Sequence, residues 1–110
     1  MNEGEGIKIH GDNNTFINVL VNSSNFEGIW FSSASNNSKL INATSILNPY
    51  GIRLSSGTNG PIENSRACGN DNTDFVCDSP ADDYSNITNS NTYGNKGTCG
   101  AWLGPSVGSC

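Results

Sequence analysis

The sequence predicts an all-β solenoid, in which short parallel strands stack in coils of roughly 22–23 residues. Three copies of the phrase Gly-Ile-x-apolar begin at Gly6, Gly28 and Gly51, so the spacing between copies is nearly constant. A fourth, degenerate copy, Asp74-Phe75-Val76-Cys77, follows at the same spacing. A repeat of this length is typical of solenoids, whose stacked coils bury one continuous core. The abundant Asn, Ser, Gly and Thr favour bends, and no stretch of the sequence shows helical periodicity.

The Gly-Ile-x-apolar phrase predicts the first strand of each coil. Its apolar residues alternate with one variable residue, so both apolar side chains point to one face and the variable one points to the other. Stacking the coils as parallel strands then predicts a buried column of Ile7, Ile29, Ile52 and Phe75. A second inward column consists of Ile9, Phe31, Leu54 and Cys77. The outward row consists of Lys8, Trp30, Arg53 and Val76.

Each coil continues with two further apolar positions, which predict a second and a third short strand between polar bends. The second position is occupied by Phe16, Leu40 and Ile62. Two residues later, every copy has an Asn: Asn18, Asn42 and Asn64. The third inward position is predicted at Val19 or Val21, then at Ile46 and then at Cys68. Equivalent Asn side chains can hydrogen-bond along a stack of strands, so we expect them to serve the fold, with Asn42 turned inward.

The second copy of the repeat resembles the phrase of right-handed parallel β-helix proteins, the pectin-lyase-like superfamily. It reads Gly28-Ile29-Trp30-Phe31-Ser32-Ser33-Ala34-Ser35-Asn36-Asn37-Ser38-Lys39-Leu40-Ile41-Asn42. The resemblance covers roughly residues 6–78, and the later cysteine-bearing stretch looks like the C-terminal end of β-helix surface proteins common in archaea. It implies short right-handed parallel β-helix coils in residues 1–78. The length of 110 residues predicts one domain in total, and the glycines, prolines and cysteines of residues 79–110 predict a last weak coil and an irregular, disulfide-tied cap. It implies no single activity, because this fold hosts enzymes, adhesins and spacers alike.

The four cysteines all lie at position 68 or later, which suggests two disulfides and hence an extracellular or cell-surface protein. Cys77 and Cys99 are one coil period apart, so they would stack and leave Cys68 with Cys110. Local pairing of Cys68 with Cys77 and of Cys99 with Cys110 remains open, as do buried free thiols. Asn-x-Ser/Thr sequences are acceptors for N-glycosylation, and the candidates are Asn22 and Asn86.

Charge and hydropathy restrict the partners. The net charge is −5, and the five Lys and Arg residues are scattered, which disfavours nucleic acid. The sequence has neither an apolar run of membrane-spanning length nor a signal peptide. Residues 1–5 contain no obvious cap, and open coil ends expose strand edges. We therefore expect either a piece of a longer β-helix or a unit that stacks end to end as a homo-oligomer or filament.

The outward row is the best candidate for a binding site. Lys8, Trp30 and Arg53 would form a basic and aromatic stripe that grips an acidic or neutral polysaccharide, with Trp30 stacking on a sugar ring. No cofactor is expected. A calcium ion is the alternative, because the C-terminal half gathers carboxylates at Asp71, Asp74 and Asp78. Their spacing matches no defined calcium loop.

The sequence favours a non-catalytic extracellular or cell-surface module, structural or glycan-contacting, with no catalytic residues. The alternative is a fragment of a polysaccharide-active enzyme (a lyase, hydrolase or epimerase), whose candidate residues are Asp71, Asp74, Asp78, Lys8 and Arg53. Polygalacturonases of this fold carry Asn-Thr-Asp and Asp-Asp, which match Asn72-Thr73-Asp74 and Asp82-Asp83, but their downstream Gly-His-Gly and Arg-Ile-Lys are missing here. An enzyme needs its carboxylates and its base on one face. The spacing places most acids away from Lys8 and Arg53.

Overall fold

Short strands alternate with polar bends along the chain, as the repeat predicts. The computed structural model describes residues 6–32, 37–55, 61–78, 87, 90–99 and 103–110. Within these ranges a 3-10 turn, η1, spans Gly97–Cys99. The strands are β1 (Ile7–Ile9), β2 (Thr15–Ile17), β3 (Leu20–Asn22), β4 (Glu27–Phe31), β5 (Lys39–Ile41), β6 (Thr44–Ile46), β7 (Tyr50–Leu54), β8 (Ile62–Glu63), β9 (Arg66–Cys68), β10 (Thr73–Cys77) and β11 (Thr92–Tyr93).

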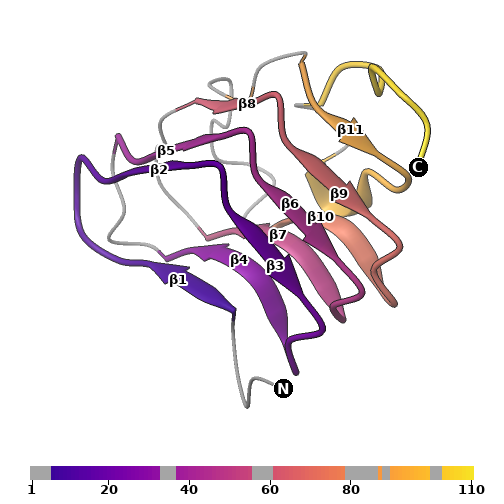
Figure 1. Ribbon diagram of the computed structural model, residues 1–110, viewed down its shortest axis with the longest axis horizontal. Helices are drawn as coiled ribbons and strands as arrows, with labels where there is room; N and C mark the ends of the chain where they lie inside the picture. Colours follow the sequence, from indigo (N-terminus) through magenta and orange to yellow (C-terminus); the bar gives the residue numbers. More distant parts are fainter. Residues whose placement is uncertain (1–5, 33–36, 56–60, 79–86, 88–89, 100–102) are drawn as a thin grey trace.

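The strands form three parallel sheets, and successive coils add one strand at a time to each sheet (Figure 1). Sheet 1 has the order β1-β4-β7-β10, sheet 2 has the order β2-β5-β8, and sheet 3 has the order β3-β6-β9-β11. Ile87 extends sheet 2 by a parallel bridge to Ile62. Parallel sheets with almost no helix place the described chain in a β-solenoid-like class.

Sheet 1 confirms the predicted register of the Gly-Ile-x-apolar phrase. Ile29 pairs with Ile7 on one side and with Ile52 on the other, and Ile52 pairs with Phe75. Ile7 is half-buried, whereas Ile29, Ile52 and Phe75 are fully buried. The second predicted column is buried along its whole length: Ile9, Phe31, Leu54 and Cys77. Burial of each aliphatic side chain of these columns stabilises the fold by roughly 1.5–3 kcal/mol.

Sheet 2 also has the predicted register, since Phe16, Leu40 and Ile62 pair in succession. In sheet 3 the predicted inward position is correct at Val21 and wrong by one residue in the next two coils. Val21 pairs with Ser45, and Ser45 with Ala67, and these three buried side chains form the inward column. Ile46 and its partner Cys68 alternate with that column, although Cys68, which is bonded to Cys110, is only 6% exposed.

Close packing explains why a serine, and not Ile46, faces the interior of β6. Ser45 Oγ donates to the carbonyl oxygen of Gly51 at 2.7 Å and accepts from Asn48 Nδ2 at 2.9 Å. A Cβ atom at Gly28 would lie 2.0 Å from the same Oγ. The interior at this corner thus has room for a hydroxyl that bonds locally and none for a branched aliphatic side chain. The same close contact explains why the repeated phrase begins with glycine.

Residues with positive φ recur at equivalent bends of successive coils. Between sheets 2 and 3 they are Asn18, Asn42 and Asn64, with φ values of 59°, 54° and 49°. Asn visits this left-handed region more readily than most residues. The Nδ2 atom of Asn42 donates to Oδ1 of Asn18 at 2.6 Å, so these two side chains form a hydrogen-bonded ladder. The prediction that Asn42 turns inward is wrong, because the bend that holds it presents the side chain to solvent.

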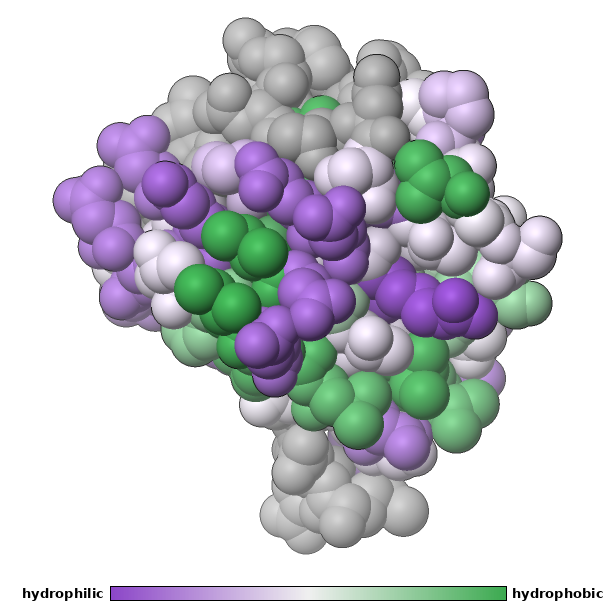
Figure 2. Space-filling view, turned by 45° about the horizontal axis from the view of Figure 1, so that its top comes forward, coloured by the Kyte–Doolittle hydropathy of each residue, from purple (hydrophilic) through white to green (hydrophobic). Residues whose placement is uncertain are grey.

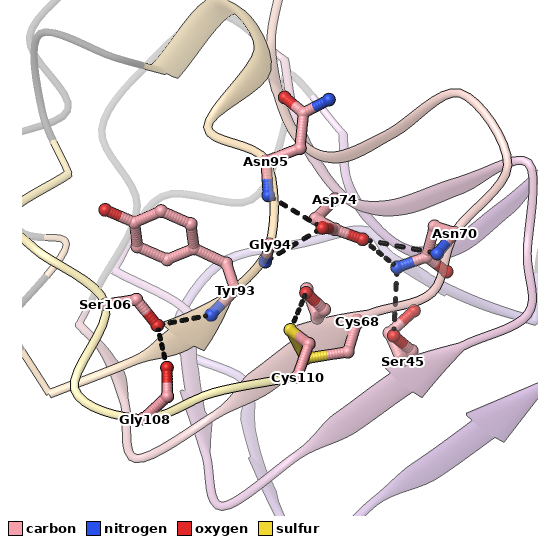
Figure 3. Close-up of a disulfide and its surroundings, with 11 residues drawn as sticks. Ser45, Cys68, Asn70, Asp74, Tyr93, Gly94, Asn95, Ser106, Gly108 and Cys110 are labelled. Carbon is pink, nitrogen blue, oxygen red and sulfur yellow. Dashed lines mark hydrogen bonds between the residues drawn. A yellow bond between two sulfur atoms is a disulfide. The ribbon is translucent and has the colours of Figure 1, made fainter.

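Two disulfides fasten the C-terminal residues to the stacked strands. Cys77 is bonded to Cys99 and Cys68 to Cys110, with Cα separations of 5.0 and 5.5 Å. This is the pairing that the coil spacing favours, and it leaves no free cysteine. Figure 3 shows the last residues passing beside Tyr93 before they reach Cys68. The Tyr93 amide donates to Ser106 Oγ at 3.0 Å, which holds this segment against β11.

Candidate ligand-binding site

The outer face of sheet 1 carries the outward row of residues that the sequence predicts. Lys8 on β1 pairs with Trp30 on β4, Trp30 pairs with Arg53 on β7, and Arg53 pairs with Val76 on β10. Their side chains point outward because each is flanked in sequence by the inward residues of the two buried columns. The structure therefore brings all three predicted ligand-binding residues, Lys8, Trp30 and Arg53, onto one face.

Trp30 lies between two cations. Lys8 Nζ is 4.5 Å and Arg53 Cζ is 4.7 Å from the centroid of its ring system. Since β1 and β7 flank β4 on opposite sides, the two cations approach opposite faces of the indole. The indole Nε1 donates to Ser55 Oγ at 2.7 Å, which fixes the ring further. A sugar ring could stack on Trp30 only by displacing one cation, and the exposed Lys8 is the easier of the two to displace.

Arg53 is held by two carboxylates from neighbouring strands. Its Nη1 donates to Glu27 Oε1, and its Nε donates to both oxygens of Asp78, at 3.0 and 2.9 Å. Ser55 Oγ donates to the same Asp78 at 3.0 Å. Burial lowers the pKa of Arg53, but its hydrogen bonds and Coulomb attraction to the two carboxylates outweigh that effect. The pKa is therefore raised above its usual value, and the guanidinium stays charged.

A pocket of about 200 Å³ opens beside this cluster. Its lining residues are Glu27, Tyr50, Arg53, Val76 and Asp78. Glu27 and Tyr50 are paired residues of β4 and β7, so the register of sheet 1 places them side by side. Glu27 is only 6% exposed, which means that its carboxylate is largely withdrawn from water. Two carboxylates and one guanidinium give the pocket a net charge of −1.

Sequence reasoning missed Glu27 and Tyr50 and misplaced Asp78. The available signal was positional: Glu27 and Tyr50 both directly precede the glycine of a Gly-Ile phrase, so stacking had to bring them together. The prediction that the acids lie away from Arg53 is wrong for Asp78. Asp78 directly follows β10, and Arg53 lies on the neighbouring β7, so the side chains meet although they are 25 residues apart.

The three carboxylates considered for calcium have different surroundings. Asp74 is 4% exposed, and its oxygens accept from the amide and Nδ2 of Asn70 and from the amides of Gly94 and Asn95 (Figure 3). Asp78 is bonded to Arg53, whereas Asp71 is exposed. Within the described ranges, no group of three or more His, Cys, Asp or Glu side chains is placed to hold a metal ion.

The remaining sequence candidates are spread over other parts of the fold. Asn22 is exposed at the end of β3, and Asn86 lies outside the described residues, as do Asp82 and Asp83. The described part of the chain contains no helix of the length and hydropathy needed to cross a membrane.

Comparison with protein-family models, with curated proteins and with solved structures finds no match to this chain.

Proposed function

We propose that this chain is a right-handed parallel β-helix of the pectin-lyase-like kind, and that it serves as a non-catalytic extracellular or cell-surface module that contacts carbohydrate. Three parallel sheets in register and the nearly constant coil period support the fold assignment. Two disulfides are compatible with an oxidising location. Glycosylation at Asn22 and Asn86 belongs to the same proposal.

The pocket of sheet 1 is the observation that carries the carbohydrate proposal. It joins a largely buried carboxylate of Glu27, the charged Arg53 and the ring of Tyr50 on one outward face. Carboxylates accept hydrogen bonds from sugar hydroxyls, and the apolar side of a sugar ring packs against aromatic and aliphatic side chains such as Tyr50 and Val76. A partly apolar cavity that contains a small number of polar groups is typical of small-molecule binding sites.

The net negative charge of the pocket determines which classes of carbohydrate it favours. Arg53 is already bonded to Glu27 and Asp78, so it has little capacity left for the carboxylate of a uronic acid. The surplus negative charge favours neutral or amino sugars, whose hydroxyl and ammonium groups donate hydrogen bonds. We therefore narrow the expected ligand from an acidic or neutral polysaccharide to a neutral or amino-sugar polysaccharide.

The same geometry argues against the enzyme alternative. Hydrolysis of a glycosidic bond uses one carboxylic acid as a proton donor and a second carboxylate as base or nucleophile. Here Glu27 and Asp78 both accept hydrogen bonds from one guanidinium, so neither is set up as a proton donor. The buried Asp74 is occupied by four backbone and side-chain donors.

The proposal is tested by calorimetric titration with neutral, amino-sugar and polygalacturonate oligosaccharides. The compared proteins are the unaltered chain, Arg53→Gln, Tyr50→Ala and the control Arg66→Gln, which removes an exposed arginine from sheet 3. We expect a neutral or amino-sugar oligosaccharide to bind, with an affinity at least tenfold weaker in Arg53→Gln and Tyr50→Ala and unchanged in Arg66→Gln. Absence of binding, or equal loss in the control, would refute the proposal. If the added oligosaccharides are found to be shortened after incubation with the protein, the enzyme alternative would be established instead.

A further inference from the structure

The core residues at the two ends of the stack of coils differ in their exposure to solvent. The core has three half-buried apolar members, Ile7, Phe16 and Val19, and all of them belong to the first coil, residues 6–26. The described core residues at the other end are at most 8% exposed: Ile87, Tyr93, Cys99 and Leu103. Val107 of the cap is 60% exposed but is not part of the core. Among the described residues, the core thus reaches solvent mainly through the first coil.

The first coil also exposes apolar side chains around its rim. Ile17, Leu20 and Phe26 are 56%, 67% and 57% exposed. Figure 2 shows hydrophobic side chains at the surface in several places, lying among hydrophilic ones. In residues 6–26 the single Lys, Lys8, balances the single acid, Asp12, whereas the whole chain carries a net charge of −5. Residues 6–26 therefore add no net charge repulsion of their own when two copies of this coil approach each other.

Strand edges lie at the same end. β1, β2 and β3 are each the first strand of their sheet, so each has a neighbouring strand on one side only in the described chain. Such edges present backbone donors and acceptors to another strand, and they promote association unless they are covered.

At the C-terminal end, the edges of sheets 1 and 3 are covered by the described residues. The amide of Val107 donates to the carbonyl oxygen of Asn91 at 3.1 Å, and the amide of Cys77 donates to Thr98 Oγ1 at 2.8 Å. The segments that cover β11 and β10 in this way are held by the disulfides of Cys110 and Cys99. Head-to-tail stacking of a first coil on the last coil of another copy would therefore have to displace the cap from two of the three sheets.

We propose that two copies of this chain associate head to head through their first coils, about a twofold axis. This interaction is independent of the carbohydrate proposal, because it uses the end of the stack and not the pocket of sheet 1. The axis would set β1 antiparallel to its counterpart, and β2 opposite β3 of the second copy. A twofold contact uses the same surface on both copies, so assembly stops at two and no filament grows.

The size of the contact sets its strength. Extents of 29 × 28 × 24 Å give an end face on the order of 500 Å² per copy, so the complete contact approaches the ~1,000 Å² that a specific interface needs. A dimer of this size is expected to dissociate at micromolar concentrations, and its mass must therefore be followed over a concentration series.

Sedimentation equilibrium of the whole chain, with its disulfides intact, tests the dimer. The mass should rise from 11.6 kDa to twice that value as the concentration increases. Leu20→Lys should weaken dimerisation at least tenfold, because it places a charge on the rim. Val107→Lys is the matched control, since Val107 is 60% exposed but lies in the cap, and it should dimerise normally. A chain that stays monomeric up to millimolar concentration, or a mass that rises beyond two copies, would overturn the proposal.

Cross-linking with an amine-reactive reagent tests the orientation. Lys8 lies at the first coil, and the exposed Lys96 lies at the opposite end, just before η1. In an equal mixture of isotopically light and heavy chains, we expect mixed-isotope Lys8–Lys8 links. Intermolecular Lys8–Lys96 links would show head-to-tail stacking and contradict the twofold arrangement.

Discussion

The Nε atom of Arg53 lies 2.9 Å from Oδ2 of Asp78, although 25 residues separate the two in the sequence. This ion pair is a direct consequence of the coil period, because it joins neighbouring strands of sheet 1. Glu27 binds the same guanidinium from the other side, so residues of three successive coils meet at one cation. The stacking of neighbouring coils, and not proximity in the sequence, therefore determines which side chains interact on this face.

The two carboxylates bound to Arg53 should contribute unequally to stability. The Asp78 side chain is 27% exposed, and exposed ion pairs contribute at most about 1 kcal/mol. The Glu27 side chain is 8% exposed, and a broken charged hydrogen bond at a buried site costs roughly 1.5–3 kcal/mol. Urea unfolding should thus show a larger loss for Glu27→Gln than for Asp78→Asn. Equal losses would mean that Glu27 is not buried against Arg53.

The two disulfides should differ in their resistance to reduction. Cys110 is exposed at the end of the cap, whereas Cys77 and Cys99 are 1% and 0% exposed. A water-soluble reductant should therefore open Cys68–Cys110 first and leave Cys77–Cys99 intact in the folded chain. Alkylation under native conditions, followed by peptide mass spectrometry, measures the order. Simultaneous reduction of both would contradict the burial of the second disulfide.

A third prediction concerns Leu47, which has a φ of 56° and is 57% exposed. Its equivalents in the neighbouring coils are Ser23 and Gly69, both also at positive φ. A left-handed conformation costs a residue such as leucine about 1–2 kcal/mol. Leu47→Asn should therefore raise the free energy of unfolding by about 0.5–1 kcal/mol, since Asn tolerates this region. Leu20→Asn, at a comparably exposed strand position, should give no such gain in the same urea titration.

The sequence was sufficient for the register of sheets 1 and 2, because their inward positions are large and apolar in each coil, as with Ile29 and Leu40. In sheet 3 the sequence led to a wrong assignment. Polar Ser45 was expected at the surface and apolar Ile46 in the core, whereas Ser45 points inward and Ile46 points outward. Hydrophobicity alone assigns these two faces wrongly, since local hydrogen bonds to Gly51 and Asn48 decide which side chain fits inside.

The candidate site was only half predictable for a related reason. The row of Lys8, Trp30 and Arg53 follows from period-two alternation within each strand. The contribution of Glu27 does not, because it depends on how far Arg53 reaches across the sheet toward an earlier coil. The order of the row did predict a cation on the coil before and on the coil after Trp30, and both lie over its ring.

Both the fold and the site depend on the stacking register of sheet 1, which methyl NMR can measure. In a chain labelled only at isoleucine methyl groups, Ile29 should show nuclear Overhauser contacts to both Ile7 and Ile52, its partners in sheet 1. A chain in which Ile29 contacts neither of these residues would contradict the coil register, and with it the site built on the outer face of sheet 1.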